Sequence, residues 1–394
     1  MHLDLPNLSP TAAGTPVKNQ RGHWTFLPNL LPPSIDWTPS LIRQLELTTT
    51  ALSRLDGALS FETAGVPAKA LARPLLKREA MFSSKIEQIQ TSIADLSAFE
   101  ATKGRSSNDA ATSETANYLH AQSDGLEHLR NGNLTCSLIK ALHQRLLDGV
   151  RGQEKTPGAF RAVQNFIGNE SLETARYIPP PPEHVPALMD NLEQFMLAKD
   201  ELPQLIRIAI THYQFEAIHP FGDGNGRVGR LLIMLQLVGY KLLTLPVLYA
   251  SAYFERNRRA YYDNLLNVSL EGSWNRWIEF FLEGVRVESE DVFARVKLLT
   301  QLQKQYNRRV ATVSRSSASL QLVKLIMSRL AITTQLVSHK LRITPQAANQ
   351  QISRLVSLGI LKEITGQKRN RVYLATEVID LLNRDLQNSE PPPP

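Results

Sequence analysis

The chain has 394 residues, of which 42% are hydrophobic and 21% charged, and its formal net charge is +7. This composition predicts two or three domains with real hydrophobic cores, and the mild basic charge is compatible with a nucleotide or nucleic-acid partner. The single cysteine, Cys136, excludes an internal disulfide, and the lack of an apolar run of about eighteen residues or of a basic-then-apolar leader predicts a cytoplasmic protein without a membrane span.

The N-terminal part of the chain is predicted to be an extended arm followed by helices. Residues 1–33 are rich in Pro, Asn, Thr and Gly, so we expect an arm that Trp24, Phe26 and Leu27 order in part. Apolar residues then recur at helical spacing, and the first of these patterns stops at Gly57. The predicted helices cover residues 40–57, 74–99, 111–130 and 136–149.

A non-helical block interrupts this series. Residues 154–186 contain four consecutive prolines at 179–182, which forbid a helix and favour an extended edge. The next predicted helices cover residues 186–199 and 203–218. His212 lies seven residues before His219, and a zinc pair would need a different spacing and a third ligand. We therefore expect His212 to be a packed, hydrogen-bonded helix residue.

Segment 219–230 is the most informative part of the chain. It reads His-Pro-Phe-Gly-Asp-Gly-Asn-Gly-Arg-Val-Gly-Arg, and the apolar, proline-free stretch that follows to Leu242 predicts a buried helix. Its glycines allow positive φ and a close approach of the backbone to a ligand, and successive N–H groups there form a concave anion site. A Gly-rich loop that opens a helix favours phosphate, because N–H donors and the positive end of the helix dipole meet there.

The charged side chains of segment 219–230 fit the same interpretation. Arg227 and Arg230 are three residues apart, share a helix face and can bind separate phosphate oxygens. Asp223 is a hard oxygen ligand of the kind that Mg²⁺ uses alongside substrate phosphates. His219 is the natural proton acceptor. The sequence therefore predicts a site that holds a magnesium-bound polyphosphate beside a general base.

Other phosphate and metal motifs fit badly. The segment has no Gly-Lys-Ser/Thr end, which excludes a P-loop. Asp223-Gly224-Asn225 is similar to the start of a calcium loop, but the twelfth position is Met234 rather than Glu. The plain alternative is a helix-capping loop whose arginines face solvent.

Segment 219–230 resembles the signature of the Fic family, His-Pro-Phe-x-Asp/Glu-Gly-Asn-Gly-Arg-x-x-Arg, at every fixed position. The resemblance implies a mainly helical enzyme that transfers AMP from ATP to a Tyr, Thr or Ser hydroxyl of a target protein, with the chain itself as one candidate target. His219 would then deprotonate the hydroxyl, which attacks the α-phosphorus as pyrophosphate leaves. Asp223 would hold Mg²⁺ on the α- and β-phosphates.

The resemblance also assigns the remaining phosphate and base contacts. Arg227 and Arg230 would bind the β- and γ-phosphates, and Gly224, Asn225 and Gly226 would line them. Residues 258–265 resemble the Fic helix that lines the adenine pocket. Within that helix, the candidates for contact with the base are Tyr261 and Tyr262.

The block before the signature resembles the Fic flap, a β-hairpin that aligns the target by main-chain pairing. The residues that carry this resemblance run from Thr156 through Asn165 to Ala175-Arg176-Tyr177-Ile178. Arg176 and Tyr177 are the candidates for contact with the target. The alternative is a rigid connector.

Residues 83–88 resemble the inhibitory helix of many Fic proteins, Ser/Thr-x-x-x-Glu-Gly/Asn. Ser83 and Glu87 match this pattern, whereas Gln88 departs from it at the last position. In the family, the glutamate pairs with the second arginine of the signature, here Arg230, and so removes the partner of the γ-phosphate. The resemblance predicts a self-inhibited enzyme. A related prediction is that Glu87 supports removal of AMP by positioning water.

The C-terminal residues are predicted to form a connector and a winged helix-turn-helix. A long charged helical pattern covers residues 282–312. Helices are then expected at 318–330, from Ile332 and from Ile343, the last with Thr344 as N-cap and Pro345 in its first turn. Two strands are expected at 360–364 and 371–374.

The span 339–371 makes DNA a candidate partner of this module. It holds seven Lys and Arg residues and one acidic residue, Glu363. The candidate contacts on the recognition helix and the basic wing are Gln346, Asn349, Gln350, Arg354, Lys368, Arg369 and Arg371. The alternative is a winged helix used for protein contact or dimerisation.

The predicted fold class is mainly α, with a small β-hairpin flap and a C-terminal winged-helix domain. The predicted parts are a helical region with the inhibitory helix (1–110), a Fic catalytic domain (111–285), a helical connector (286–315), the winged helix (316–385) and a disordered tail (386–394). The predicted function is a self-inhibited protein adenylyltransferase that uses ATP and Mg²⁺ and forms a homo-oligomer. The alternatives are an ATP-sensing DNA-binding regulator and a Doc-type kinase, which binds the nucleotide reversed and usually has Lys where Gly226 stands.

Overall fold

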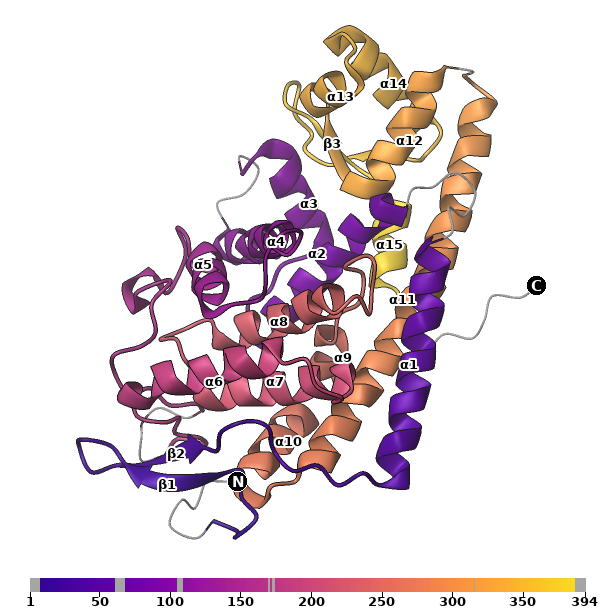
Figure 1. The fold of residues 1–394 in the computed structure, drawn as a ribbon. Helices are drawn as coiled ribbons and strands as arrows, with labels where there is room; N and C mark the ends of the chain where they lie inside the picture. Colours follow the sequence, from indigo (N-terminus) through magenta and orange to yellow (C-terminus); the bar gives the residue numbers. More distant parts are fainter. Residues whose placement is uncertain are drawn as a thin grey trace. The chain divides into compact units, whose positions relative to one another are not determined.

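The computed structural model describes residues 8–60, 68–104, 109–168, 171, 174–314 and 316–386. These residues are mainly helical, with two small antiparallel sheets (Figure 1). None of the described helices is long and apolar enough to cross a membrane. The start of the predicted arm and nearly all of the predicted tail fall outside the described residues.

The chain forms two compact units, each built from separate stretches of sequence. The first unit comprises residues 1–52, 117–243 and 249–288, and the second comprises residues 53–116, 244–248 and 289–394. The predicted parts follow one another along the chain. In the structure, residues 53–116 instead belong to the same unit as residues 289–394. The reason is packing, because the helices of residues 68–102 contact the C-terminal helices and strands of their own unit.

The first unit carries segment 219–230. Its strands are β1 (Gly14–Lys18) and β2 (Trp24–Pro28), and its short 3-10 turns are η3 (Gln153–Lys155) and η4 (Pro182–His184). Its helices are the first part of α1 (Pro39–Ser60), the second part of α4 (Ala110–His128), α5 (Cys136–Leu146), α6 (Val185–Leu197), α7 (Gln204–Ile218), α8 (Asn225–Gly239), α9 (Ser251–Arg256), α10 (Arg258–Glu271) and the first part of α11 (Trp274–Ala311).

Helices α7 and α8 form the core of the first unit. Every residue of α7 except Gln204 and Glu216 is buried, including the polar Arg207, His212 and Gln214. Helix α7 packs against α8, α6 and α10. The indole N–H of Trp277 in α11 donates to the carbonyl oxygen of Ala209 in α7 at 2.9 Å. The predicted helices 186–199 and 203–218 are thus confirmed as the buried scaffold next to the signature.

The N-terminal arm is more ordered than its composition predicts. Strands β1 and β2 pair in antiparallel register, with Gly14 opposite Pro28 (Figure 1). Phe26 is fully buried, and its N–H donates to the carbonyl oxygen of Ile178 at 2.9 Å. A hairpin of this kind is held by main-chain pairing and one aromatic anchor, which explains why a Pro- and Asn-rich stretch gave no clear strand signal.

The second unit contains the remaining elements. Its helices are the end of α1, α2 (Ala68–Ile86), α3 (Ile93–Thr102), the start of α4, the end of α11, α12 (Ser317–Arg329), α13 (Thr334–Leu341), α14 (Pro345–Ser357) and α15 (Thr376–Asn383). Its strands are β3 (Ala331–Thr333), β4 (Lys362–Glu363) and β5 (Val372–Leu374), in the order β3-β5-β4 with both pairs antiparallel. We call residues 317–386 the C-terminal module.

Two local predictions in the second unit can be compared with the structure. The predicted helix 74–99 is two helices, because the chain leaves the helical conformation at Gln88 and restarts after Ser92. The hydroxyl of Ser92 caps α3 by accepting the N–H of Asp95 at 3.0 Å. The predicted cap of α14 is confirmed, since the Thr344 hydroxyl accepts the N–H of Ala347 at 3.2 Å.

Candidate functional site

The loop between α7 and α8 carries the predicted base. Helix α7 ends at Ile218, and His219 is its C-cap in the left-handed region, with φ 49° and ψ 60°. The N–H of His219 donates to the carbonyl oxygen of Phe215 at 3.0 Å. A left-handed conformation costs a residue with a Cβ about 1–2 kcal/mol, so the surrounding contacts have to hold it in place.

Asn225 braces the loop from inside. Its Oδ1 accepts the N–H of Phe221 at 2.8 Å, and its Nδ2 donates to the carbonyl oxygen of the same residue at 2.9 Å. The residue is only 2% exposed. Both polar groups of this side chain are used within the loop, so the lining of the phosphates by Asn225, which stays a prediction, would fall to its main chain. Its side chain fixes the shape of the loop.

His143 of α5 contacts the same loop through its ring. Its ring stacks on Phe221, with ring centroids 3.8 Å apart and planes 9° apart. The N–H of Gly158 donates to its Nδ1 at 2.9 Å, so the ring proton is on Nε2, which donates to the carbonyl oxygen of Asp223 at 3.0 Å. Burial lowers the pKa of His143 to about 4, so the ring is neutral at physiological pH.

Arg161 ties the block 154–186 to the loop. Its guanidinium donates to four main-chain carbonyl oxygens, and its own N–H donates to the carbonyl oxygen of Pro220 at 2.9 Å. The four acceptors and their distances are His219 (2.9 Å), Pro180 (2.6 Å), Ile218 (3.3 Å) and Val163 (3.4 Å). The residue is 4% exposed. One buried cation thus joins both arms of this block to the strained His219.

The N-terminus of α8 has the features of an anion site. Gly224, with φ 78°, is the N-cap residue, and no side chain caps the helix. Arg227 and Arg230 in the first turns are 1% and 3% exposed. This burial rules out the alternative in which the two arginines face solvent. Between them, α7 packs closely against Gly229, since a Cβ there would lie 2.3 Å from Oε1 of Glu216 and 3.1 Å from Cδ1 of Phe215.

Asp223 is the one half-exposed carboxylate of the loop. Its Oδ1 accepts the N–H of Gly224 at 2.6 Å, and its closest approach to Arg227 is 4.0 Å. Its side chain is 36% exposed. No group of three or more His, Cys, Asp or Glu side chains that could hold a metal occurs among the described residues. This donor set fits a cation such as Mg²⁺, which takes one or two carboxylates and completes its shell with phosphates and water.

The structure corrects the prediction for the target contacts of the flap. Tyr177 is 7% exposed, and its hydroxyl donates to the carbonyl oxygen of Ala217 at 2.9 Å. Arg176 is paired with Asp263 of α10. Among the described residues of the block, one antiparallel bridge, between Ile167 and Tyr177, joins its two arms. Tyr177 is therefore a packing residue rather than a target contact, and Arg176 contacts α10.

One of the two adenine candidates is also corrected. Tyr261 is 1% exposed, stacks on Phe254 at 4.5 Å and contacts Nε2 of His212 through its hydroxyl at 2.8 Å. It is part of the core, so its predicted contact with the base is wrong. Tyr262 is half-buried, with the Arg258 guanidinium 6.0 Å from its ring centre. Contact of Tyr262 with the adenine base stays a prediction.

The expectation for His212 is confirmed. Its Nδ1 contacts the carbonyl oxygen of Gly229 at 3.2 Å, and the residue is 1% exposed. Burial, reinforced by the nearby charge of Arg230, lowers its pKa to about 3. His212 is therefore a neutral core residue that joins α7 to α8 and α10.

The predicted inhibitory residues lie in the second unit. Ser83 is fully buried in α2, and Glu87 directly follows the last residue of that helix, Ile86. The N–H of Gln88 donates to the carbonyl oxygen of Lys85 at 3.0 Å. The N–H of Ile89 donates to the carbonyl oxygen of Ser84, also at 3.0 Å. These are the two bonds of a Schellman motif, in which Gln88, with φ 63°, takes the position usually filled by Gly or Asn.

The Schellman motif gives a physical reason for the last position of the inhibitory pattern. A left-handed residue is needed where Gly or Asn stands in that pattern, and Gln88 adopts this conformation at a cost. Glu87 is the C-cap, so its carboxylate lies at the negative end of the helix dipole, where acidic residues are unfavourable.

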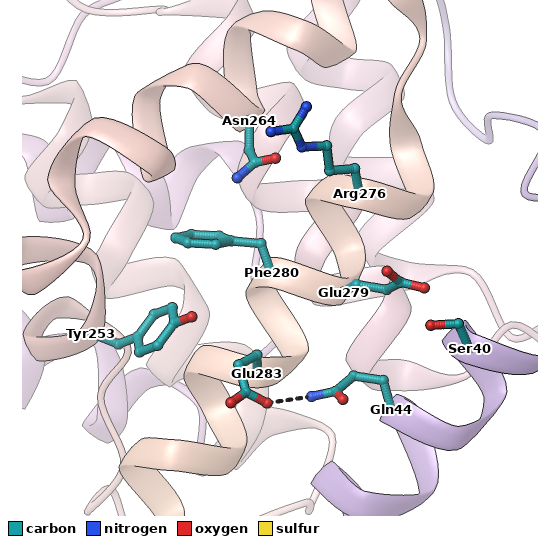
Figure 2. A pocket seen from close by; sticks show the side chains of 8 residues that line it. All are labelled: Ser40, Gln44, Tyr253, Asn264, Arg276, Glu279, Phe280 and Glu283. Carbon is teal, nitrogen blue, oxygen red and sulfur yellow. Dashed lines mark hydrogen bonds between the residues drawn. The ribbon is translucent and has the colours of Figure 1, made fainter. Parts of the chain in front are cut away.

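A separate cavity of about 400 Å³ lies in the first unit (Figure 2). Residues of α1, α9, α10 and α11 line it, including Tyr253, Asn264 and Phe280. Near its rim, Nε2 of Gln44 donates to Oε2 of Glu283 at 2.8 Å. None of the predicted site residues lines this cavity, so it adds nothing to the predicted nucleotide site.

Sequence reasoning missed His143 and Arg161. Both act on main-chain atoms of a loop that lies 58 or more residues further along the chain. The available signals were weak: a lone histidine inside an amphipathic helix, and a lone arginine after Thr156-Pro157-Gly158. Neither residue type at such a position predicts a contact to a particular carbonyl group.

Comparisons with known proteins agree with this geometry. The sequence profile of the Fic/DOC family matches residues 133–237, and that of the Fic/DOC family N-terminal region matches residues 42–127. Similar proteins include the protein adenylyltransferase Fic of Culex quinquefasciatus, 32% identical over 158 residues, and that of Aedes aegypti, 31% identical over 158 residues. Each match covers 39% of this chain and 28% of the relative.

The chain thus spans little more than a quarter of the length of these curated relatives. Among solved structures, a Fic family protein from Desulfovibrio desulfuricans G20 is similar with a TM-score of 0.58 and 19% sequence identity. This likeness covers 88% of this chain and 98% of the other. It shows that the two chains share a fold.

Proposed function

We propose that this chain, which carries a Fic/DOC family domain at residues 133–237, transfers AMP from ATP to a hydroxyl side chain of a target protein. The observation that carries the proposal is a single loop. His219 ends α7 in a strained conformation, and Gly224 then starts α8 without a side-chain cap. A base and an anion site on one braced segment are suited to positioning a hydroxyl against a phosphate. The insect relatives are named protein adenylyltransferases, which supports the same reaction.

In the proposed reaction, the His219 imidazole accepts the proton of the target hydroxyl. The hydroxyl oxygen forms a bond to the α-phosphorus of ATP. The bond between the α-phosphorus and the oxygen that bridges to the β-phosphorus breaks, and pyrophosphate leaves with that electron pair. Arg227, Arg230 and the N–H groups at the start of α8 stabilise the negative charge on the phosphates.

We also propose that Asp223 binds Mg²⁺. A hard, half-exposed carboxylate that already accepts the N–H of Gly224 fits this ion. When bound, the ion would neutralise charge on the phosphates. In the chain itself, the carbonyl oxygen of Asp223 accepts a hydrogen bond from neutral His143, which holds the main chain of this residue in place.

We also propose that Glu87 inhibits the enzyme by occupying Arg230. The support is the match of Ser83 and Glu87 to the inhibitory pattern, together with the position of Glu87 as the C-cap of α2. A carboxylate on Arg230 would remove a donor that the γ-phosphate needs. The same carboxylate would position water for removal of AMP, and Glu87→Gln should abolish that reverse activity.

A second candidate function is DNA binding by the C-terminal module. In the span 339–371, Gln346, Gln350, Lys368, Arg369 and Arg371 are exposed. Arg354 is half-buried, and Asn349 accepts a hydrogen bond from the Thr334 hydroxyl at 2.6 Å. The order of helices and strands in this module is also that of a winged helix-turn-helix. A gel shift whose affinity falls steeply with salt would support this role, and no shift at low salt would refute it.

The proposed reaction is tested by the position of a radioactive phosphate. Glu87→Gly protein is incubated with Mg²⁺ and ATP labelled at the α- or the γ-phosphate, alone and with a cell lysate. AMP transfer labels protein from the α-label only. A Doc-type kinase would label it from the γ-label only, and no label from either nucleotide would contradict both enzyme assignments. Gly226, where kinases of that type usually have Lys, favours the first outcome.

A further inference from the structure

Helix α2 is fixed in its middle by two adjacent buried cations. Lys77 is fully buried and Arg78 is 7% exposed. Buried charges are rare unless they are paired, because their removal from water is costly. Each of these two side chains is held by partners from a different part of the second unit, and together they attach α2 to the C-terminal residues.

Lys77 joins α2 to α3 and α12. Its ammonium lies 2.8 Å from Oε2 of Glu100, 2.9 Å from the hydroxyl of Ser97 and 2.8 Å from the carbonyl oxygen of Arg329. An ammonium has three donors, so all three are used. Arg329 is the last residue of α12, and Glu100 also pairs with Arg73 at 2.6 Å. We call this group the lysine clamp.

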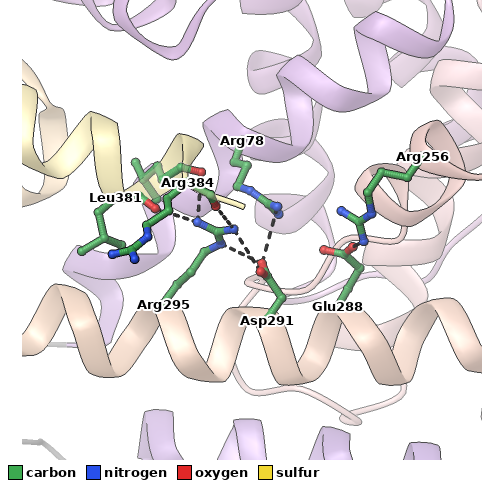
Figure 3. A network of polar contacts seen from close by, with 8 residues as sticks. Arg78, Arg256, Glu288, Asp291, Arg295, Leu381 and Arg384 are labelled. Atoms are coloured by element: carbon green, nitrogen blue, oxygen red, sulfur yellow. Dashed lines mark hydrogen bonds and ion pairs between the residues drawn. The ribbon is translucent and has the colours of Figure 1, made fainter. Parts of the chain in front are cut away.

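Arg78 joins α2 to α11 and α15 (Figure 3). Its guanidinium lies 3.5 Å from Oδ2 of Asp291, a carboxylate whose side chain is 2% exposed. Both oxygens of Asp291 also accept from Arg295, at 2.7 and 2.9 Å. Arg295 in turn donates to the carbonyl oxygens of Leu381 (2.6 Å) and Arg384 (2.8 Å) at the end of α15. We call this group the aspartate clamp.

Apolar packing follows the same connections. Helix α2 contacts α12 and α15, and α3 contacts β3 and β5. The N–H of Ala375, which precedes α15, donates to the carbonyl oxygen of Leu330, which follows α12, at 2.9 Å. Helix α2, which contains Ser83 and is followed by Glu87, therefore packs against the C-terminal module and belongs to the same unit as that module. The signature lies in the other unit.

We infer that the C-terminal module sets the position of Glu87 through the two clamps on α2, and so controls AMP transfer. This inference rests on the proposed inhibition by Glu87. Glu87 lies ten residues beyond Lys77, about 15 Å along a continuous helix. A helix of this length moves as a rigid element, so a shift of α12 or α15 against α2 is passed to its end. A ligand that binds the C-terminal module more tightly in the shifted state would raise activity.

The test is transfer of the α-phosphate label by full-length Lys77→Met and Asp291→Asn proteins. Lys77→Met removes the clamp and leaves Glu100 paired with Arg73, whereas Asp291→Asn leaves Arg295 its carbonyl acceptors. Both variants should therefore fold, which circular dichroism checks. We expect each to raise labelling about fivefold or more over wild type, the lower end of typical coupling between sites.

The matched control is Glu127→Gln, which breaks an ion pair of α4 whose side chains are 69% and 70% exposed. It should label like wild type. In a Glu87→Gly background, neither clamp variant should raise labelling further, because the contact through which the clamps act is already absent. Hydrogen exchange at residues 79–86 should be faster in both clamp variants than in wild type.

The outcomes separate the inference from the function on which it rests. If Glu87→Gly labels strongly and both folded clamp variants label like wild type, the inference is wrong and the proposed function stands. If Glu87→Gly itself does not label, the proposed function fails, whatever the clamp variants do. Faster exchange in α2 without any rise in labelling would also refute control of activity by the clamps.

Discussion

Helices α7 and α2 are both followed by a left-handed residue other than Gly, but different contacts hold the two ends. Helix α7 ends at His219 with φ 49°, and α2 is followed by Gln88 with φ 63°. Both are left-handed positions at which Gly or Asn is usual. At His219, the guanidinium of Arg161 and the braced loop hold the backbone from other segments of the chain. At Gln88, the two main-chain bonds of the Schellman motif hold the helix end.

This difference matches the proposed roles of the two ends. The strain at His219 is over-determined by tertiary contacts, as expected for a group that has to be preorganised for catalysis. The strain at Gln88 is balanced by local bonds, so this end can reform at little cost when α2 moves. The fixed end carries the base, and the adaptable end carries the inhibitory carboxylate.

The largest effect is expected from Arg161→Met. This change leaves four carbonyl oxygens without their donor, and a hydrogen bond from a charged group contributes about 1.5–3 kcal/mol, so the unfolding free energy should fall by about 3–5 kcal/mol or more. Transfer of AMP should fall by about a hundredfold, since small misplacements of a reacting group have effects of this size. Urea unfolding and the α-phosphate assay measure the two effects. Arg259→Met, at a side chain that is 96% exposed, should change neither.

A smaller effect is expected from His143→Phe. The aromatic stack on Phe221 is kept, while the N–H of Gly158 and the carbonyl oxygen of Asp223 lose their partner. Each unsatisfied buried group costs about 1–3 kcal/mol, so the unfolding free energy should fall by roughly 2–4 kcal/mol. If it changes by less than a few tenths of a kcal/mol, His143 does not brace the loop.

The pH dependence of stability sharpens the same point. The folded-state pKa of His143 is about 4 and its ordinary value is 6.5, so the neutral ring is favoured in the folded protein. Its contribution is complete above pH 6.5 and is lost as the pH falls towards 4, to a total of about 3 kcal/mol at most. His212 changes in the same direction, because burial lowers its pKa to about 3. The difference between wild type and His143→Phe should shrink over this range.

The smallest effect is expected at the other helix end. Gln88→Gly removes the cost of a left-handed residue with a Cβ and adds the entropy cost of Gly. The net result should be a rise of about 0.5–1 kcal/mol in the unfolding free energy. Gln90→Gly, at an exposed position just beyond the Schellman motif, is the control and should give no such gain. A loss of stability on Gln88→Gly would show that the Gln side chain makes contacts that outweigh the backbone strain.

The sequence predicted the site well where its chemistry is contiguous. Segment 219–230 places the base, the glycines and both arginines in one run, so residue types and spacing were enough. His143 and Arg161 escaped because they bind main-chain atoms far along the chain. Tyr261 and Tyr262 looked alike in sequence, and only packing shows that the first belongs to the core.

The fold was predictable to a similar degree and failed for similar reasons. Helical spacing gave most helices, and Thr344 identified the start of α14. The break between α2 and α3 was missed, because Gln88 is an unusual left-handed residue and Ser92 is a short capping signal. The two units have segments that alternate along the chain, an arrangement that linear domain boundaries cannot express.

The most direct test of the central claim compares Glu87→Gly with Glu87→Gly/His219→Ala in the α-phosphate assay. We expect strong labelling of protein by the first variant. We expect a loss of at least a hundredfold in the second, because the general base is gone while the phosphate contacts of α8 remain. Equal labelling by the two proteins would contradict the assignment of His219 as the base and, with it, the proposed reaction at this loop.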